Sequence, residues 1–276
     1  MSRVSILFTI LSVLICGPVR GQEPDVTKVA DVNTGQDETR PLARFDLKYQ
    51  YQNIPGSDHD NVQIITARVD KPLKLSKNWE LALRFDQPIY VSDVVSNDNP
   101  GGKSILGVGD LIAQGLLIHA PASKRFAWGA GARLVFPTAS KDTMGFGKWR
   151  VISTVGVRYS TPEITKGSWV GLVARWDKDF AGDPNRAHIS ELQLAPQLYV
   201  QLPNTWFVQL YPATDIRHNI AAKRRIDTGR WFLPIDVVTG RMLNKRMIAS
   251  FEIGVPLINQ YKVYDFKVEG RIGYFF

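Results

Sequence analysis

The feature that most restricts the fold of this chain is an alternation of apolar and polar residues with a period of two. In residues 43–52, Phe45, Leu47 and Tyr49 fall on one face, and charged or amide residues fall on the other. Successive side chains of a β-strand point to opposite faces, so this pattern predicts strands rather than helices. The same alternation recurs in residues 79–86, 126–136, 247–255 and 266–276.

About twelve such segments begin near residues 43, 62, 79, 108, 125, 149, 168, 189, 205, 231, 246 and 264. Most are about 9–13 residues long, whereas strands of soluble proteins usually have about 5–6. A tilted strand that crosses a bilayer needs about 9–11 residues. We therefore expect an all-β fold, a transmembrane antiparallel β-barrel of about twelve strands. Pro196, Pro212 and Pro234 interrupt proposed strands, which leaves ten or fourteen strands as alternatives.

The connections between the segments alternate in length. Those after odd-numbered segments are long and polar, except for a modest last one, and those after even-numbered segments are short, as at Pro203-Asn204 and Asn244-Lys245. Outer-membrane barrels have long loops on one side and short turns on the other. A secreted β-sandwich is the alternative fold, because its strands also have one apolar face and one polar face that meets water. It does not explain why long and short connections alternate.

The chain divides into three parts. Residues 1–21 have a basic start and an apolar core of about 13 residues, which predicts a signal peptide that would remove Cys16, the single cysteine. Residues 22–42 are polar and acidic, and we expect a periplasmic segment that is flexible or enters the lumen. Residues 43–276 are the expected outer-membrane β-barrel of a Gram-negative cell. Phe276, with Tyr274 and Ile272 alternating before it, resembles the terminal signal read by the barrel-assembly machinery.

The inward faces of the proposed strands carry basic and acidic residues in nearly equal number. A ring of one sign would select ions by charge, and this set forms no such ring. Twelve strands lie between the filled eight-stranded barrels and the wide sixteen-stranded porins. We expect a narrow, substrate-restricted lumen; the alternative is that the charges satisfy one another and close it. The pore-lining candidates are Arg44, Asp46, Lys48, Arg68, Arg84, Asp86, Arg133, Arg158, Arg175, Glu191, Glu252, Lys267, Glu269 and Arg271.

Three motifs resemble landmarks of an outer-membrane family. They are Gly107-Val108-Gly109-Asp110-Leu111, Leu134-Val135-Phe136-Pro137-Thr138-Ala139 and Gly145-Phe146-Gly147-Lys148-Trp149, in this order. That family carries the label "MetA-pathway of phenol degradation" or transporter. Phe146 and the lack of a following Gly-Pro depart from its pattern. The resemblance implies a barrel of about twelve strands that passes small, aromatic or apolar compounds.

We expect an outer-membrane channel for passive uptake or export of small molecules, and not an enzyme. The four histidines are His59, His119, His188 and His218, and the chain has neither a Gly-x-Ser-x-Gly elbow nor the Cys/His spacing of a zinc site. No cofactor or metal is expected. A barrel-embedded hydrolase with a rim histidine and a structural or adhesive barrel with a closed lumen are the alternatives.

The expected partners are membrane lipid and a small-molecule solute, together with the assembly machinery. Residues 216–230 hold Arg217, Lys223, Arg224, Arg225 and Arg230 against one acid, Asp227. These bases suit lipopolysaccharide phosphates or an anionic solute, and a solvated loop is the alternative. Nucleic acid is not an expected partner of an exported barrel.

Overall fold

The protein is known from a computed structural model, which describes residues 32–53, 61–96, 99–121, 125–222, 227–261 and 263–276. The predicted signal peptide, His59 and the bases at 223–225 lie outside these residues. The strands are β1 (Arg44–Asn53), β2 (Asn61–Lys74), β3 (Trp79–Ser92), β4 (Ile105–Val108), β5 (Leu111–His119), β6 (Phe126–Phe136), β7 (Lys148–Ser160), β8 (Trp169–Gly182), β9 (Ser190–Gln201), β10 (Trp206–Leu210), β11 (Ile216–Asn219), β12 (Trp231–Met242), β13 (Met247–Asn259) and β14 (Phe266–Phe275).

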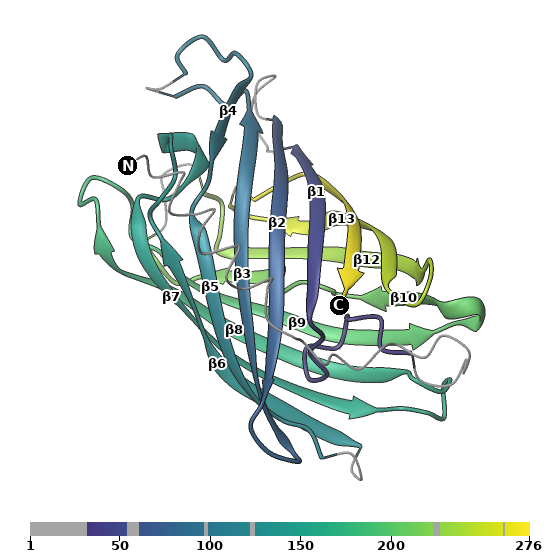
Figure 1. Cartoon of the computed structure of the whole chain (residues 1–276). Coiled ribbons are helices and arrows are strands. Elements are labelled where there is room, and N and C mark those ends of the chain that lie inside the picture. The colour runs from purple at the N-terminus through teal and green to yellow at the C-terminus, as the bar shows by residue number, and fades with distance from the viewer. Residues whose placement is uncertain (1–31, 54–60, 97–98, 122–124, 223–226, 262) are drawn as a thin grey trace.

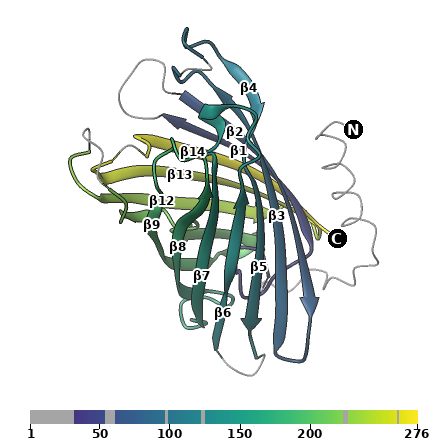
Figure 2. The ribbon, with the colours of Figure 1, turned by 90° about the vertical axis from the view of Figure 1, so that its left-hand side faces the viewer.

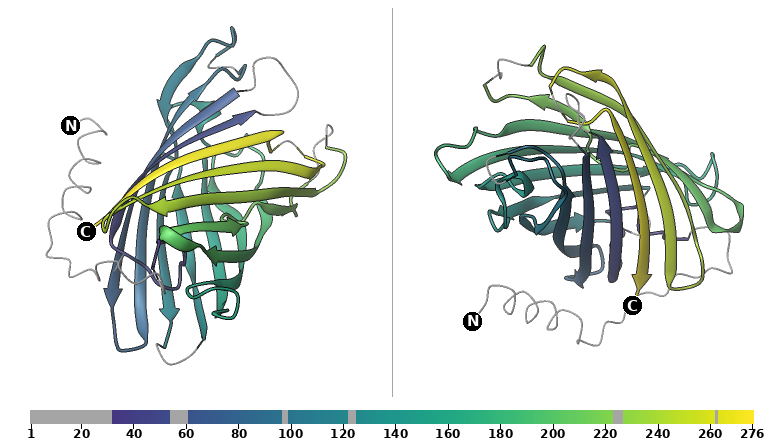
Figure 3. Two further views of the ribbon diagram at one scale, coloured as in Figure 1. Left: turned by 90° about the vertical axis from the view of Figure 1, so that its right-hand side faces the viewer. Right: turned by 90° about the horizontal axis from the view of Figure 1, so that it is seen from above.

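Two of the barrel strands are interrupted, so these segments form a twelve-stranded barrel. β4 and β5 both pair with β3, and β10 and β11 both lie between β9 and β12. All pairings are antiparallel. When each interrupted strand is counted as one, they join neighbours in the chain, except that β1 pairs with β14 from Arg44–Phe275 to Asn53–Phe266. This last pairing closes the sheet (Figure 1) and brings the purple β1 beside the yellow β14 in Figure 3. The predicted fold and strand number are confirmed.

The prolines account for local irregularities without changing the strand number. Pro212 lies in the break between β10 and β11, directly after Tyr211, whose φ is 50°. Pro234 lies at a register shift between β12 and β13. Pro196 stays in the ladder of β9 opposite Leu172. Proline thus stands at a break and a bulge, where the loss of its N–H is tolerated.

The break between β4 and β5 brings the three sequence motifs together. Gly109 and Asp110 form the break, and the Asp110 carboxylate accepts hydrogen bonds from the backbone N–H groups of Ala139 (3.1 Å) and Phe146 (3.0 Å). The Thr138 hydroxyl accepts one from the N–H of Leu111 at 2.9 Å. The motifs therefore fasten one loop, which includes the 3₁₀ helix η1 (Asp142–Met144), to the rim of the barrel.

The connections fall at two ends, visible in Figure 2. The end with the short turns holds residues 75–78, 161–168, 202–205 and 243–246; we call it the short-turn end. One of these turns contains the 3₁₀ helix η2 (Pro203–Thr205), in which Asn204 has a φ of 55°. The opposite, long-loop end corresponds to the cell exterior in outer-membrane barrels.

The two faces of the wall differ as the alternation predicts. On β1 and β14, Leu47 is 49% and Ile272 56% exposed, whereas Asp46 and Lys267 are buried on the inward side. Outward apolar side chains are the lipid-facing surface of an outer-membrane barrel. Among the described residues no helix is long and apolar enough to cross a membrane.

One close approach of neighbouring strands depends on glycine. Gly131 of β6 lies opposite Leu116 of β5, and a Cβ at position 131 would stand 2.9 Å from the Leu116 Cα and closer still to the Gly115 carbonyl oxygen. By contrast, a Cβ added at Gly270 of β14 would meet no other atom within 4 Å.

We expect Gly131→Ala to destabilise the barrel by about 1–3 kcal/mol because the added methyl group forces the two backbones apart. The measurement is the temperature at which the folded, faster-migrating band disappears in electrophoresis. Gly270→Ala is the matched control and should behave as the wild type. An unchanged transition for Gly131→Ala would contradict the close approach.

Candidate functional site

The interior of the barrel is lined by paired charges on adjacent strands. Asp70 of β2 accepts hydrogen bonds from Arg44 and Arg84, each at 2.6 Å. Arg68 and Asp86 form a two-point ion pair at 2.6 and 3.0 Å. These side chains are directly opposite one another in the strand register, because Arg44 pairs with Asp70 and Arg68 with Asp86. The wall therefore neutralises much of its own inward charge.

A second group of charges, which we call the Lys267 cluster, lies on the wall formed by β11 to β14. The Lys267 ammonium lies 2.7 Å from Glu252 and 3.2 Å from Asp236, and it also contacts Asp215. Arg217 adds a hydrogen bond of 2.8 Å to Asp215. Asp215, Asp236 and Glu252 have the arrangement of a metal-ligand set, but the ammonium lies among them and supplies the balancing charge.

The remaining pore-lining candidates also face inward. Lys48 pairs with Glu269 at 2.6 Å, and Arg271 lies 3.2 Å from Asp46. Glu191 accepts a hydrogen bond of 2.7 Å from the Tyr261 hydroxyl. The structure thus brings the candidates together in pairs and small clusters. Their role as the lining of an open pore stays a proposal.

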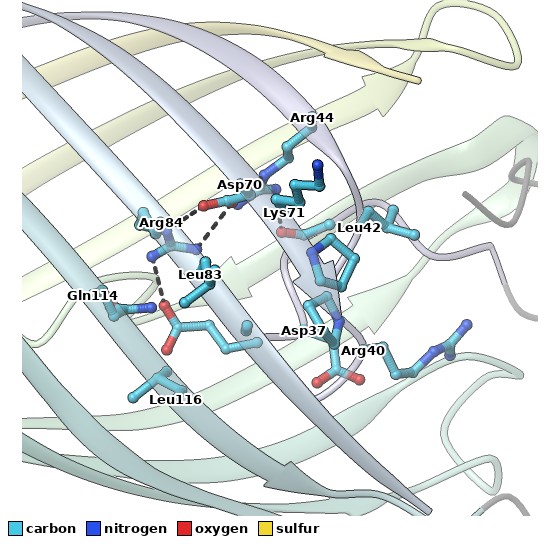
Figure 4. A pocket seen from close by; sticks show the side chains of 15 residues that line it. Asp37, Arg40, Leu42, Arg44, Asp70, Lys71, Leu83, Arg84, Gln114 and Leu116 are labelled. Atoms are coloured by element: carbon cyan, nitrogen blue, oxygen red, sulfur yellow. Dashed lines mark hydrogen bonds and ion pairs between the residues drawn. The ribbon is translucent and has the colours of Figure 1, made fainter. Parts of the chain in front are cut away.

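Residues 32–42 lie inside the barrel, against these inward faces. The Glu38 carboxylate lies 3.0 Å from Arg84, 3.5 Å from Arg175 and 3.9 Å from Arg133. These arginines belong to β3, β8 and β6, so one carboxylate joins three separate strands. Figure 4 shows the Arg84 guanidinium beside Asp70, and Arg84 also donates a hydrogen bond of 3.0 Å to Glu38.

Neighbouring residues hold the same segment at two further points. Asp37 pairs with Arg158 of β7 at 2.9 Å. The Thr34 hydroxyl and the Tyr199 hydroxyl are 2.9 Å apart. The pore-lining candidates do not include Asp37 and Glu38. The sequence nevertheless indicated a role for these residues, because they belong to an acidic segment that could enter the lumen.

Local interactions fix the shape of the segment. The Asp37 carboxylate accepts hydrogen bonds from the backbone N–H of Thr39 at 2.9 Å and from its hydroxyl at 2.6 Å, which forms a turn. Gly35 has a φ of 70°, a conformation that glycine adopts without strain, and its carbonyl accepts a hydrogen bond from Arg44 at 2.5 Å. The turn presents Glu38 to the arginines.

Burial by itself would raise the pKa of Glu38, but the positive charges of Arg175, Arg84 and Arg133 outweigh burial and hold the pKa well below its ordinary value. Glu38 is therefore an anion at neutral pH, and its contact with the arginines is a contact between opposite charges.

Aromatic side chains fill the lumen near the short-turn end. Trp169 and Tyr199 stack with ring centroids 5.4 Å apart and an interplanar angle of 7°, and Phe207 lies 5.5 Å beyond Tyr199. Val32 of the N-terminal segment belongs to this buried cluster, with Leu42 packed against it. The segment is therefore held by apolar contacts as well as by charge.

Two pockets flank Glu38. One, with about 20 Å³ of water-accessible space, is lined by Arg44, Asp70, Arg84 and Gln114 (Figure 4). The other, with about 30 Å³, has a more apolar wall that includes Leu116, Ile118, Trp169 and Val173. Residues 37 and 38 line both pockets, so the segment divides the space between them.

The described histidines have different surroundings. His119 packs against Trp79 with ring centroids 4.7 Å apart, and His218 against Trp231 at 4.4 Å. His188, at the long-loop end, lies 3.0 Å from Asp179. The hydroxyl of nearby Ser190 accepts a hydrogen bond from the Trp176 indole instead. An aspartate–histidine pair is present, but a serine nucleophile is not shown beside it.

No protein-family model matches the chain, and no curated protein matches it. Among solved structures it is similar to the COG4313 outer membrane channel from Pseudomonas putida F1, with 17% identity, 86% of this chain and 96% of the other covered, and a TM-score of 0.64. It is also similar to the NanC porin, with 12% identity, coverage of 84% and 98%, and a TM-score of 0.50. The fold is that of an outer-membrane β-barrel channel. Membership of the phenol-degradation family stays a prediction.

Replacing Lys267 tests the Lys267 cluster. Lys267→Met removes the charge that balances three buried carboxylates, and we expect a loss of about 3–5 kcal/mol in stability. Adding Asp236→Asn should restore part of this loss because one buried negative charge is removed. The measurement is the thermal transition of the folded band. Lys48→Met, which breaks a less buried pair, should have a smaller effect, and equal effects of both lysine variants would contradict this account.

Proposed function

We propose that the protein is an outer-membrane channel for the passive movement of small molecules, and that residues 32–42 close its lumen in the state described here. The observation that carries the proposal is the contact of Glu38 with arginines on β3, β6 and β8. A segment that precedes the barrel and binds to three parts of its inner wall lies across the route a solute would take. The outer-membrane channel fold supplies the framework for this role.

The wall supports a narrow, substrate-restricted passage. The pairs Arg44–Asp70, Arg68–Asp86 and Lys48–Glu269 join neighbouring strands and project into the lumen. Balanced inward charge gives no ring of one sign, so the wall as a whole is not expected to select solutes by net ionic charge. The aromatic cluster of Trp169, Tyr199 and Phe207 is buried together with Val32, and it would offer an apolar surface to small aromatic or apolar solutes at the short-turn end once the segment moves.

A structural or adhesive barrel with a closed lumen is the second candidate. The same density of ion pairs favours it, because paired charges fill space and need no solute. The two functions differ in one measurable property: a channel closed by a segment can be opened without rebuilding its wall, whereas a solid interior cannot.

The test is conductance of the purified full chain in planar bilayers. We expect small conductance from the wild type and a several-fold increase in the double variant Asp37→Asn/Glu38→Gln, because both ionic contacts of the segment with Arg158 and with the three arginines are weakened. The double variant Asp142→Asn/Glu163→Gln removes the same charge from exposed residues and is the control. An unchanged conductance in the first variant would favour the closed barrel, and a wide, unselective wild-type conductance would exclude a narrow lumen.

The location and the other partners are also proposals. The bases that the sequence carries at 223–225, together with Arg230, suit lipopolysaccharide, whereas Arg217 pairs with Asp215 in the interior. Phe276 suits recognition by the assembly machinery. Heat-dependent electrophoretic mobility in isolated outer membranes tests the location. Recovery of the protein in the soluble periplasmic fraction would contradict it.

A further inference from the structure

The carboxylate of Glu38 lies among three arginines of the barrel wall, and these arginines form a candidate site for an anion. We propose that this site binds a small molecule that has a carboxylate and an apolar body, and that the carboxylate of the solute takes the place of Glu38. The inference rests on the proposed channel function and names the chemical class of its solute.

The wall arginines have too few anionic partners of their own. Arg84 is paired with Asp70, but the other hydrogen bonds of Arg133 and Arg175 go to the neutral side chains of Gln114 (2.5 Å) and Thr214 (2.8 Å). Within the described residues, the buried Nε of Arg175 has no hydrogen-bond partner. When Glu38 leaves, two guanidinium groups lose the anion that lies next to them.

An uncompensated charge in a confined interior is unfavourable, so an anion from outside is strongly attracted to this site. The planar guanidinium group donates hydrogen bonds in a geometry that matches a carboxylate. The Glu38 side chain demonstrates this fit, since its two oxygens lie 3.0 Å from Arg84 and 3.5 Å from Arg175. A free carboxylate would meet the same donors.

An apolar wall lies beside the arginines. The more apolar of the two pockets reaches Glu38 and has Leu116, Ile118, Trp169 and Val173 in its wall. While Glu38 is in place, the water-accessible space of this pocket is only about 30 Å³, so movement of residues 32–42 must supply the rest of the room for an apolar body. A carboxylate at the arginines would therefore place an attached ring or short chain against apolar side chains.

Competition with Glu38 links binding to opening. The segment is part of the chain, so its carboxylate is always near the arginines, and the solute binds only to the fraction of molecules in which the segment has moved away. The solute in turn stabilises the open arrangement. Glu38 thus acts as an internal competitor that keeps the lumen closed until a suitable anion is present.

The test is equilibrium dialysis of the purified full chain with radiolabelled benzoate. Glu38→Gln removes the competing charge, and we expect it to bind benzoate about tenfold more tightly than the wild type. Glu163→Gln, at an exposed glutamate paired with Arg125, should match the wild type. Benzyl alcohol has the same ring without the carboxylate, and its binding should not change with Glu38→Gln.

A second variant locates the site. Adding Arg133→Gln to Glu38→Gln should remove the gain in benzoate binding, with heat-dependent mobility confirming that both proteins fold. Equal binding of benzoate by Glu38→Gln and the wild type would overturn the inference, even if conductance rises and the channel proposal stands. Tighter benzoate binding without any rise in conductance would uphold the anion site and contradict the channel.

Discussion

The pairing of β1 with β14 is the constraint on which the rest of the structure depends. In lipid, backbone N–H and C=O groups must find partners within the protein, and a closed sheet satisfies them without leaving an edge. Closure also assigns each side chain to the lipid or to the lumen. The inward residues, such as Asp46 and Arg271, are thereby confined to an interior with little water, where charges must be paired.

The ion pairs of the interior are of two kinds. Arg44–Asp70 and Arg68–Asp86 join strands that are already held together by the backbone ladder, so they cannot separate without opening the wall. The contacts of Glu38 join the wall to a segment outside the sheet. Only contacts of the second kind can break while the barrel stays intact, which is why the segment is the suitable part to move.

The alternating sequence was sufficient to predict the strands but not their irregularities. Residue 108 was expected to begin one strand, and the structure has two pieces, β4 and β5, separated by Gly109 and Asp110. The reason is tertiary: the Asp110 carboxylate binds backbone N–H groups of a loop about thirty residues later. Pro212 likewise lies in a break, where the sequence indicated only that a proline interrupts a proposed strand.

By itself the sequence determined the all-β class and predicted about twelve strands and the inward charged set, because side-chain direction in a strand depends only on the parity of position. Only the tertiary structure decided which charges meet. Glu38 and Arg175 are far apart in the chain, and their contact depends on how the barrel closes and where residues 32–42 enter it. Periodicity records the face on which a residue lies, but it carries no information about its partner across the lumen.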